Sequence, residues 1–148
     1  MKPYICEFSS SLSPQCQMGW TYVASTDCCY MALNSSGTWG LMSTKCRDAG
    51  GDLVSIHSTF ENSITSAIAY NAGITQAWIG IVVGNQNDNS TWTWSDGSKL
   101  NYTNWGTSVN GENVTGYIDS IDNFLQAQWN ISAPGESRQC VCKTASFT

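Results

Sequence analysis

The sequence has 148 residues, a formal net charge of −5 and only 11% charged residues. This length predicts one domain with its own core, and the lack of basic clusters excludes nucleic acid and anionic membrane surfaces as partners. Seven cysteines without zinc-ligand spacing favour a disulfide framework in a secreted, extracellular protein, and the absence of an 18-residue apolar run predicts no membrane span.

The chain begins with a segment that lacks hydrophobic periodicity. Residues 1–15 contain two prolines and are predicted to be an extended tail, which leaves residues 16–148 as the domain. Residues 20–24 and 28–33 are short strand candidates around a Ser-Thr-Asp turn, and residues 34–37 are expected to form a loop.

Two helices are predicted next. Thr38 is a suitable N-cap for a first helix that ends at the Gly50-Gly51 pair. Ser58 and Glu61 have the spacing of a capping box, so a second helix is expected to start there and to end at Gly73. The helical period places four apolar residues of the second helix on one face: Phe60, Ile64, Ala67 and Ile68.

The second half of the chain reads as strands around one long polar segment. Residues 77–83 are apolar on both faces, as expected for a central buried strand, and Trp92 and Trp94 alternate with threonine on the next strand. Residues 96–113 have no apolar period, and a long loop of this kind is usually functional. Three further strands are predicted, at residues 114–121, 124–129 and 138–143.

Trp78-Ile79-Gly80-Ile81, followed by Trp92-Thr93-Trp94-Ser95-Asp96-Gly97, resembles the C-type lectin-like domain. The hairpin cysteines at Cys16 and Cys29 and the segment from Asn101 to Trp105 add to the resemblance, which covers residues 16–143 and is closest to a long-form, divergent member of the kind that invertebrates secrete. It implies an α+β fold with two helices flanking antiparallel sheets, the chain ends paired in one sheet, and a function in recognition instead of catalysis.

Members of this family that bind sugar through calcium carry E-P-N or Q-P-D in the long loop and W-N-D on a later strand. Here the matching residues are Ser108-Val109-Asn110 and Trp129-Asn130-Ile131, so two carboxylates are missing. Calcium takes six to eight oxygen ligands with carboxylates among them, and the candidates that remain are Asn110, Glu112 and Asn130. We therefore expect no cofactor and no calcium at this position.

The long loop and its neighbouring strand are the predicted binding surface for a glycan or protein ligand, as in immune or host recognition. The candidate contact residues are Tyr102, Trp105, Ser108, Asn110, Glu112, Asn113 and Asn130. Two alternatives stay open: a calcium-dependent lectin with an atypical ligand set, and a structural or surface-adsorbing module. His57, the only histidine, is interpreted as a structural residue at a strand-to-helix junction.

The resemblance also implies disulfide pairings. Cys46 and Cys142 match the most regular pair of the family, and Cys16 with Cys29 matches the hairpin pair of long-form members. Cys28 is then assigned to Cys140, although Cys16–Cys28 with Cys29–Cys140 is a close rival. Cys6 is left over, either for a disulfide-linked dimer or as a free thiol.

Five N-x-S/T sequons occur, at Asn34, Asn89, Asn101, Asn113 and Asn130. In a chain rich in Asn, Ser and Thr, some of them arise by composition alone, and together with the cysteines they favour an exported glycoprotein.

Overall fold

The fold comes from a computed structural model that describes residues 15–106, 108–120 and 127–146. The predicted tail therefore lies outside the described residues except for residue 15. No helix among the described residues is long and apolar enough to cross a membrane. The elements in chain order are β1 (Thr21–Val23), β2 (Cys28–Gly37), α1 (Trp39–Asp48), β3 (Asp52–Leu53), α2 (Thr59–Asn71), β4 (Gln76–Asn85), β5 (Asp88–Trp94), β6 (Glu112–Asp119), β7 (Trp129–Ser132) and β8 (Arg138–Ala145).

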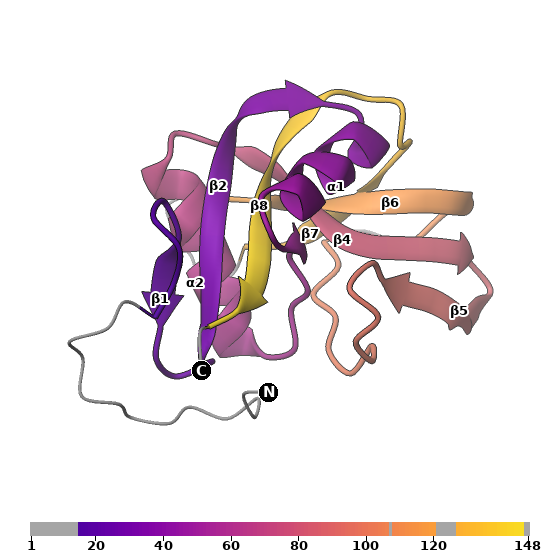
Figure 1. The fold of residues 1–148 in the computed structure, drawn as a ribbon. Helices are drawn as coiled ribbons and strands as arrows, with labels where there is room; N and C mark the ends of the chain where they lie inside the picture. Colours follow the sequence, from indigo (N-terminus) through magenta and orange to yellow (C-terminus); the bar gives the residue numbers. More distant parts are fainter. Residues whose placement is uncertain (1–14, 107, 121–126, 147–148) are drawn as a thin grey trace.

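The strands form one mixed sheet in the order β1-β2-β8-β4-β6-β7, with β3 added beside β8 and β5 added beside β4 (Figure 1). The described pairs are antiparallel except β4 with β8, which run parallel where Ala77 faces Gln139 and Trp78 faces Cys140. This contact joins two antiparallel parts into one sheet. The predicted α+β class and the pairing of the two ends of the chain are confirmed.

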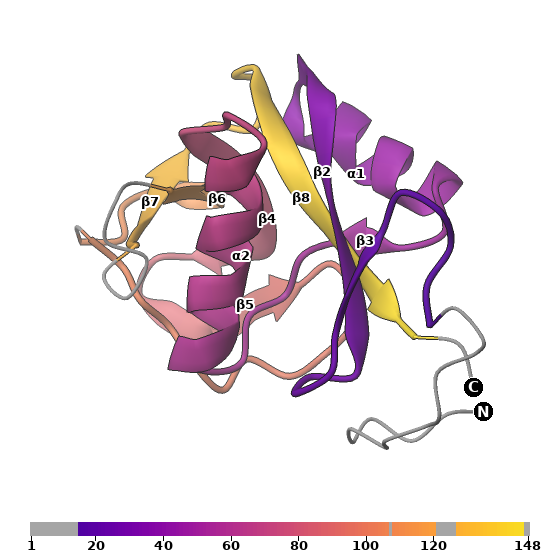
Figure 2. The same ribbon diagram turned by 90° about the vertical axis from the view of Figure 1, so that its left-hand side faces the viewer.

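The two helices cover opposite faces of the sheet, and β8 passes between them in Figure 2. Neighbouring residues of a strand point to opposite faces, so Trp78 packs with α1 while Ile79 belongs to the cluster under α2. Both side chains are fully buried, as predicted for a central strand that is apolar on both faces.

The predicted helix ends are confirmed. The Thr38 hydroxyl accepts a hydrogen bond from the backbone N–H of Leu41 at 3.3 Å, and Gly50 follows α1 with a φ of +103°. The Ser58 hydroxyl accepts from the backbone N–H of Glu61 at 3.0 Å, and Gly73 follows α2 with a φ of +80°. Both glycines adopt the left-handed conformation that commonly ends helices.

The buried face of α2 only partly matches the predicted one, since Ile64 and Ile68 are half-buried against the core. Phe60 is 54% exposed, whereas the buried residues of α2 are Glu61, Asn62, Thr65, Ser66 and Ala69. Asn62 donates to the Ala127 carbonyl at 2.8 Å and accepts from the Trp129 indole at 2.7 Å. Long-range partners therefore satisfy polar groups that a local hydrophobic pattern assigns to the surface.

A buried ion pair ties α2 to β8. Glu61 Oε2 lies 2.5 Å from Lys143 Nζ, and the two side chains are only 5% and 4% exposed. The Tyr30 hydroxyl donates to the same carboxylate at 2.7 Å, and Lys143 also donates to the Ser55 carbonyl at 3.1 Å. Burial, together with the nearby Glu61 charge, raises the pKa of Tyr30 well above its ordinary value. At this point α2 and β8 are therefore joined in the core by an ion pair and its hydrogen bonds instead of an apolar contact. We call these groups the buried charge network.

Two strand predictions need correction. β2 continues through residues 34–37, which were expected to be a loop, because Gly37 pairs with Arg138 beyond an irregularity in the β2–β8 ladder. The strand predicted at residues 124–129 is instead β7 at Trp129–Ser132, which pairs with β6. Residues 124–126 lie outside the described residues.

The structure contains the Cys16–Cys29 and Cys46–Cys142 disulfides, as predicted. The predicted Cys28–Cys140 pairing is wrong. In the antiparallel β2–β8 ladder Cys28 faces Ala145 and Cys140 faces Leu33, so the two cysteines lie five residues apart along the strands, roughly 17 Å. A disulfide needs Cα atoms within about 7 Å. Cys6 lies outside the described residues.

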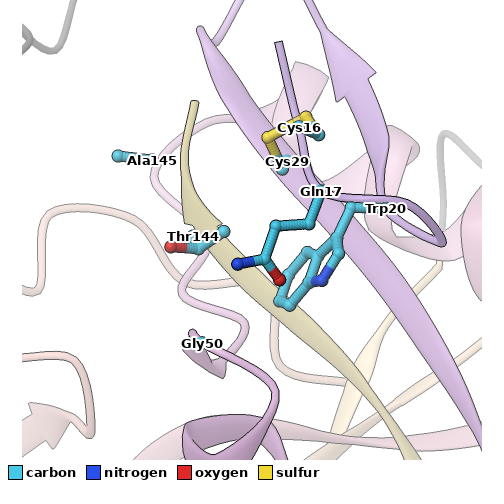
Figure 3. Close-up of a pocket in the computed structure, with 7 residues that line it drawn as sticks. All are labelled: Cys16, Gln17, Trp20, Cys29, Gly50, Thr144 and Ala145. Atoms are coloured by element: carbon cyan, nitrogen blue, oxygen red, sulfur yellow. A yellow bond between two sulfur atoms is a disulfide. The ribbon is translucent and has the colours of Figure 1, made fainter. Parts of the chain in front are cut away.

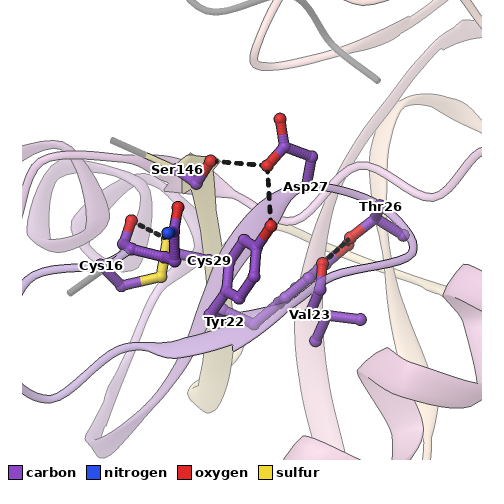
Figure 4. The surroundings of a disulfide bond; sticks show 9 residues. Cys16, Tyr22, Val23, Thr26, Asp27, Cys29 and Ser146 are labelled. Atoms are coloured by element: carbon purple, nitrogen blue, oxygen red, sulfur yellow. Dashed lines mark hydrogen bonds between the residues drawn. A yellow bond between two sulfur atoms is a disulfide. The ribbon is translucent and has the colours of Figure 1, made fainter. Parts of the chain in front are cut away.

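The turn between β1 and β2 meets the end of β8 at one corner of the molecule. Asp27, with a φ of +55°, accepts hydrogen bonds at Oδ1 from the Tyr22 hydroxyl at 3.0 Å and from the Ser146 hydroxyl at 2.8 Å. Figure 4 shows these bonds beside the Cys16–Cys29 disulfide. The two ends of the described chain are therefore fastened side by side.

Candidate functional site

The long loop connects β5 to β6 and is anchored at its start by Asp96. The Ser55 hydroxyl donates to Asp96 Oδ2 at 2.5 Å, and the Ser98 backbone N–H donates to Oδ1 at 2.8 Å. Burial opposes ionisation of this carboxyl, but the hydrogen bonds from Ser55 and Ser98 and the charge of Lys143 outweigh it and hold the pKa of Asp96 below its ordinary value. The root of the loop is thereby tied to the buried charge network.

The middle of the loop extends the sheet beyond β7. The Trp129 backbone N–H donates to the Asn104 carbonyl and the Gly106 N–H donates to the Trp129 carbonyl, both at 2.8 Å. The Asn104 side chain also donates to the Ala127 carbonyl at 2.6 Å. These bonds fix this part of the loop to a rigid element, which is how scaffolds present recognition residues.

Two candidate contact residues, Tyr102 and Trp105, pack against Trp129. Their rings meet its indole edge-on, with centroids 5.8 and 5.5 Å away, and Trp92 contacts Trp105 at 6.1 Å. Both are half-buried and belong to the rim of the core under α2. Their principal contacts thus hold the loop on the sheet, and only part of each ring faces solvent.

The far end of the loop meets the turn between β4 and β5. The Gly111 backbone N–H donates to Gln86 Oε1, and Asn85 of β4 pairs with Glu112 at the start of β6. Ser108 and Asn110 are exposed, as expected of contact residues. The side chains of Glu112 and Asn113 lie outside the described set, although their backbone forms the first part of β6.

The β4–β5 turn was not among the predicted site residues. We define the polar rim as the exposed residues of this turn, of the start of β5 and of the loop end beside it: Gln86, Asn87, Asp88, Asn89, Ser108 and Asn110. The turn is shaped by its own side chains, since Asn85 Oδ1 accepts from the Asn87 N–H at 2.8 Å and Asp88 Oδ1 from the Ser90 N–H at 3.1 Å. An unbroken polar run between two strands was the signal that could have revealed it.

Asn130 lies outside the polar rim, because it pairs with Tyr117, five residues along β6 from Glu112. Its side-chain N–H donates to Asp119 Oδ2 at 2.7 Å, and its Oδ1 lies 3.3 Å from where a Cβ on Gly106 would be. Burial raises the pKa of Asp119, opposed by hydrogen bonds from Gln76 and Asn130 and by the charge of Arg138. No interaction among the described residues joins Asn130 to Asn110.

Of the three candidate calcium ligands, the structure describes the side chains of Asn110 and Asn130 only. Asn130 is engaged by Asp119, Ser108 replaces one carboxylate and Ile131 replaces another. Among the residues that the structure describes, the one group of three His, Cys, Asp or Glu side chains close enough to share a metal is Cys46, Cys140 and Cys142. Sulfur is a soft ligand and does not suit calcium.

Two hollows of the structure lie away from the polar rim. One, of about 60 Å³, is walled by Gln17, Trp20 and the Cys16–Cys29 disulfide (Figure 3). It has room for a few waters and is too small for a drug-sized ligand. A second, of about 300 Å³, is an open depression between Met31 and Ile68.

The sequons differ in accessibility. Asn34, Asn89 and Asn101 are exposed, and Asn101 Oδ1 lies 2.9 Å from His57 Nδ1. Asn130 is half-buried with its amide bonded to Asp119. The tie to Asn101 and the edge-on contact of His57 with Trp94, 6.1 Å between centroids, agree with a structural role for the histidine.

The profile of the family described as "Lectin C-type domain" matches residues 35–144. The chain belongs to the C-type lectin domain family. The galactose-specific lectin nattectin of Thalassophryne nattereri is 34% identical over 130 residues, covering 86% of this chain and 79% of nattectin. The type-2 ice-structuring protein of Hemitripterus americanus is 37% identical over 97 residues, covering 66% of this chain.

The same fold recurs in solved structures of the family. A calcium-independent type II antifreeze protein superimposes with a TM-score of 0.75 at 22% identity, over 93% of this C-type lectin-like chain and all of the other. The chain spans only 9% of lymphocyte antigen 75 from Mesocricetus auratus and 55% of the ice-structuring protein. The relatives include lectins and antifreeze proteins, which are binding modules, not enzymes. An invertebrate origin stays a prediction.

Proposed function

We propose that this C-type lectin-like domain is an extracellular recognition module that binds a neutral glycan or a protein at the polar rim without calcium. The observation that carries the proposal is the bond from Gly111 to Gln86, which joins the loop end and the β4–β5 turn into one surface. Its exposed side chains are mainly amides and hydroxyls, which donate to and accept from sugar hydroxyls or a polar protein surface.

The test is an oligosaccharide array probed in calcium and again in a chelator. Galactose-terminated oligosaccharides are the first probes, because nattectin is galactose-specific. The proposal predicts the same bound glycans in both buffers. Binding that disappears in the chelator would instead support the calcium-dependent alternative.

Calcium is expected to leave the thermal stability unchanged. A ligand raises the melting temperature only by binding the native state, and two of the expected carboxylates are replaced by Ser108 and Ile131. The measurement is a thermal melt in millimolar calcium, in magnesium and in chelator. A rise of several degrees that is specific to calcium and reversed by the chelator would contradict this prediction.

Replacing Asn110 and Glu112 together with alanine is expected to weaken binding of the best array ligand at least tenfold, about 1.4 kcal/mol, if both side chains hydrogen-bond to it. The matched control is Asn71→Ala with Asp48→Ala, which removes one exposed amide and one exposed carboxylate from the two helices. Calorimetric titration measures both variants. Equal affinity of the two folded variants would place the ligand elsewhere.

Two exposed threonines favour a second candidate function, adsorption to ice. Thr91 and Thr93 lie two apart on β5 and so share a face, and the relative from Hemitripterus americanus is named as ice-structuring. Thermal hysteresis of the purified domain tests this candidate. A freezing point equal to that of an albumin control at the same concentration would remove it.

A sugar attached to the domain itself would compete with either function. Asn89 belongs to the polar rim and lies in an Asn-Ser-Thr sequon. Its modification would cover the surface, so the array is best run on both glycosylated and enzymatically deglycosylated protein.

A further inference from the structure

A third buried sulfur lies against the disulfide that staples α1 to β8. Cys140 Sγ is 3.7 Å from Cys46 Sγ, while Cys46 is bonded to Cys142. All three side chains are completely buried, and their sulfurs lie within 4.8 Å of one another. Cys140 itself is in no disulfide. The cluster therefore holds one disulfide and one thiol in contact.

The pattern of β8 explains why Cys46 has two neighbours. Cys140 and Cys142 are two residues apart, so both point to the face that α1 covers. Cys142 pairs with Met31, and Cys140 pairs with Leu33, two residues further along the same ladder. Cys46, in the last turns of α1, faces this pair of positions.

We propose that Cys140 is an exchange partner of the Cys46–Cys142 disulfide, so that the staple between α1 and β8 exists as two interconvertible bonds. The Cys140 thiolate attacks Cys46 Sγ, the Cys46–Cys140 bond forms, and the Cys46–Cys142 bond breaks. Cys142 leaves as the thiolate and takes up the proton that Cys140 gave to solvent. The step needs no oxidant or reductant, because one disulfide and one thiol are present before and after.

The alternative staple closes nearly the same chain loop. The existing bond spans a sequence separation of 96, and Cys46 and Cys140 are separated by 94. The restriction of the unfolded chain is therefore nearly equal for the two bonds. The exchange still changes the native packing, because the attachment point moves two residues along β8, roughly 7 Å. Forming the second bond brings Cys46 Sγ from 3.7 Å to bonding distance of Cys140 Sγ, in the cluster that also contains Met42 and Trp78.

The native state holds the exchange back. Burial raises the pKa of Cys140 to about 12, which keeps the attacking thiolate scarce at neutral pH. Exchange is thus expected mainly when the α1 side of the sheet opens locally. A cysteine that served only as a small apolar side chain would show no exchange even then.

The first experiment uses Cys142→Ser, oxidatively refolded and mapped under non-reducing conditions. The proposal predicts a Cys46–Cys140 disulfide and a melting temperature well above that of the double variant Cys140→Ser/Cys142→Ser, which removes both β8 sulfurs that face Cys46. Folded Cys142→Ser in which Cys46 and Cys140 are both alkylated would overturn the proposal.

The second experiment keeps the native sequence, in case Cys142→Ser does not fold. The protein is held in sub-denaturing urea without oxygen or metal, quenched in acid and alkylated after unfolding. Cys140 and Cys142 fall in the tryptic peptide of residues 139–143, so fragmentation at Val141 locates the label. We expect labelled Cys142 at least tenfold above the level in Cys140→Ser. Equal labelling of Cys142 in the two proteins at every urea concentration would overturn the proposal.

Discussion

Replacing Trp129 with alanine is expected to lower the free energy of unfolding by about 4 to 5 kcal/mol, near the upper end for large-to-small core changes. Trp129 is completely buried, and the rings of Trp94, Tyr102 and Trp105 meet its indole edge-on at 5.5 to 5.8 Å. Its loss also leaves the Asn62 amide oxygen without the indole donor. Urea denaturation monitored by circular dichroism measures the change.

Trp129→Phe is the matched control, because it keeps an aromatic ring and removes the indole N–H. It should lose clearly less stability than the alanine variant. Hydrogen exchange adds a local readout, since the Gly106 amide donates to the Trp129 carbonyl and should lose protection when the loop detaches. An alanine variant that loses under about 1 kcal/mol would show that the aromatic cluster does not hold the loop in place.

Lys143→Met is expected to cost about 3 to 5 kcal/mol, because it leaves the Glu61 carboxylate buried without its ion-pair partner. For a chain of this size, that lowers the melting temperature by roughly 6 to 20 °C. The Ser55 carbonyl loses a donor as well. Calorimetry at neutral pH provides the measurement.

Two further variants test whether the loss of stability comes from the buried ion pair. Lys99→Met, at an exposed lysine, removes the same charge with little expected effect. Glu61→Gln combined with Lys143→Met should recover part of the loss, because no unpaired charge remains buried. If the double variant is as unstable as the sum of the two single variants, the pair is not coupled and the interpretation is wrong.

Local signals predicted much of the fold. The caps at Thr38 and Ser58 and the apolar run of β4 depend on neighbours in sequence, and each was found from sequence alone. The burial of Glu61 and Asn62 on α2 was missed because their partners are Lys143 and Trp129, far along the chain.

The register of the strands could not be predicted from the sequence either. It separates Cys28 from Cys140 along the β2–β8 ladder and brings Asn130 to Asp119. The exposure of Ser108 and Asn110 could be predicted because polar loop residues usually face water. The contribution of Gln86 to the polar rim could not be predicted, because it depends on how the β4–β5 turn bends toward the loop end at Gly111.

The hydrogen bond from Ser146 to Asp27 holds the two ends of the described chain together, so both ends offer an attachment point at the same corner of the domain. Both ends of the described chain leave from the corner of β1, β2 and β8, while the β4–β5 turn projects from the far side of the sheet (Figure 1). Attachment through either end, to a sensor chip, a carrier or a neighbouring domain, would therefore leave the polar rim pointing outward. Several copies on one support would present their polar rims in the same direction. The overall avidity for a multivalent partner would then exceed the affinity of a single contact.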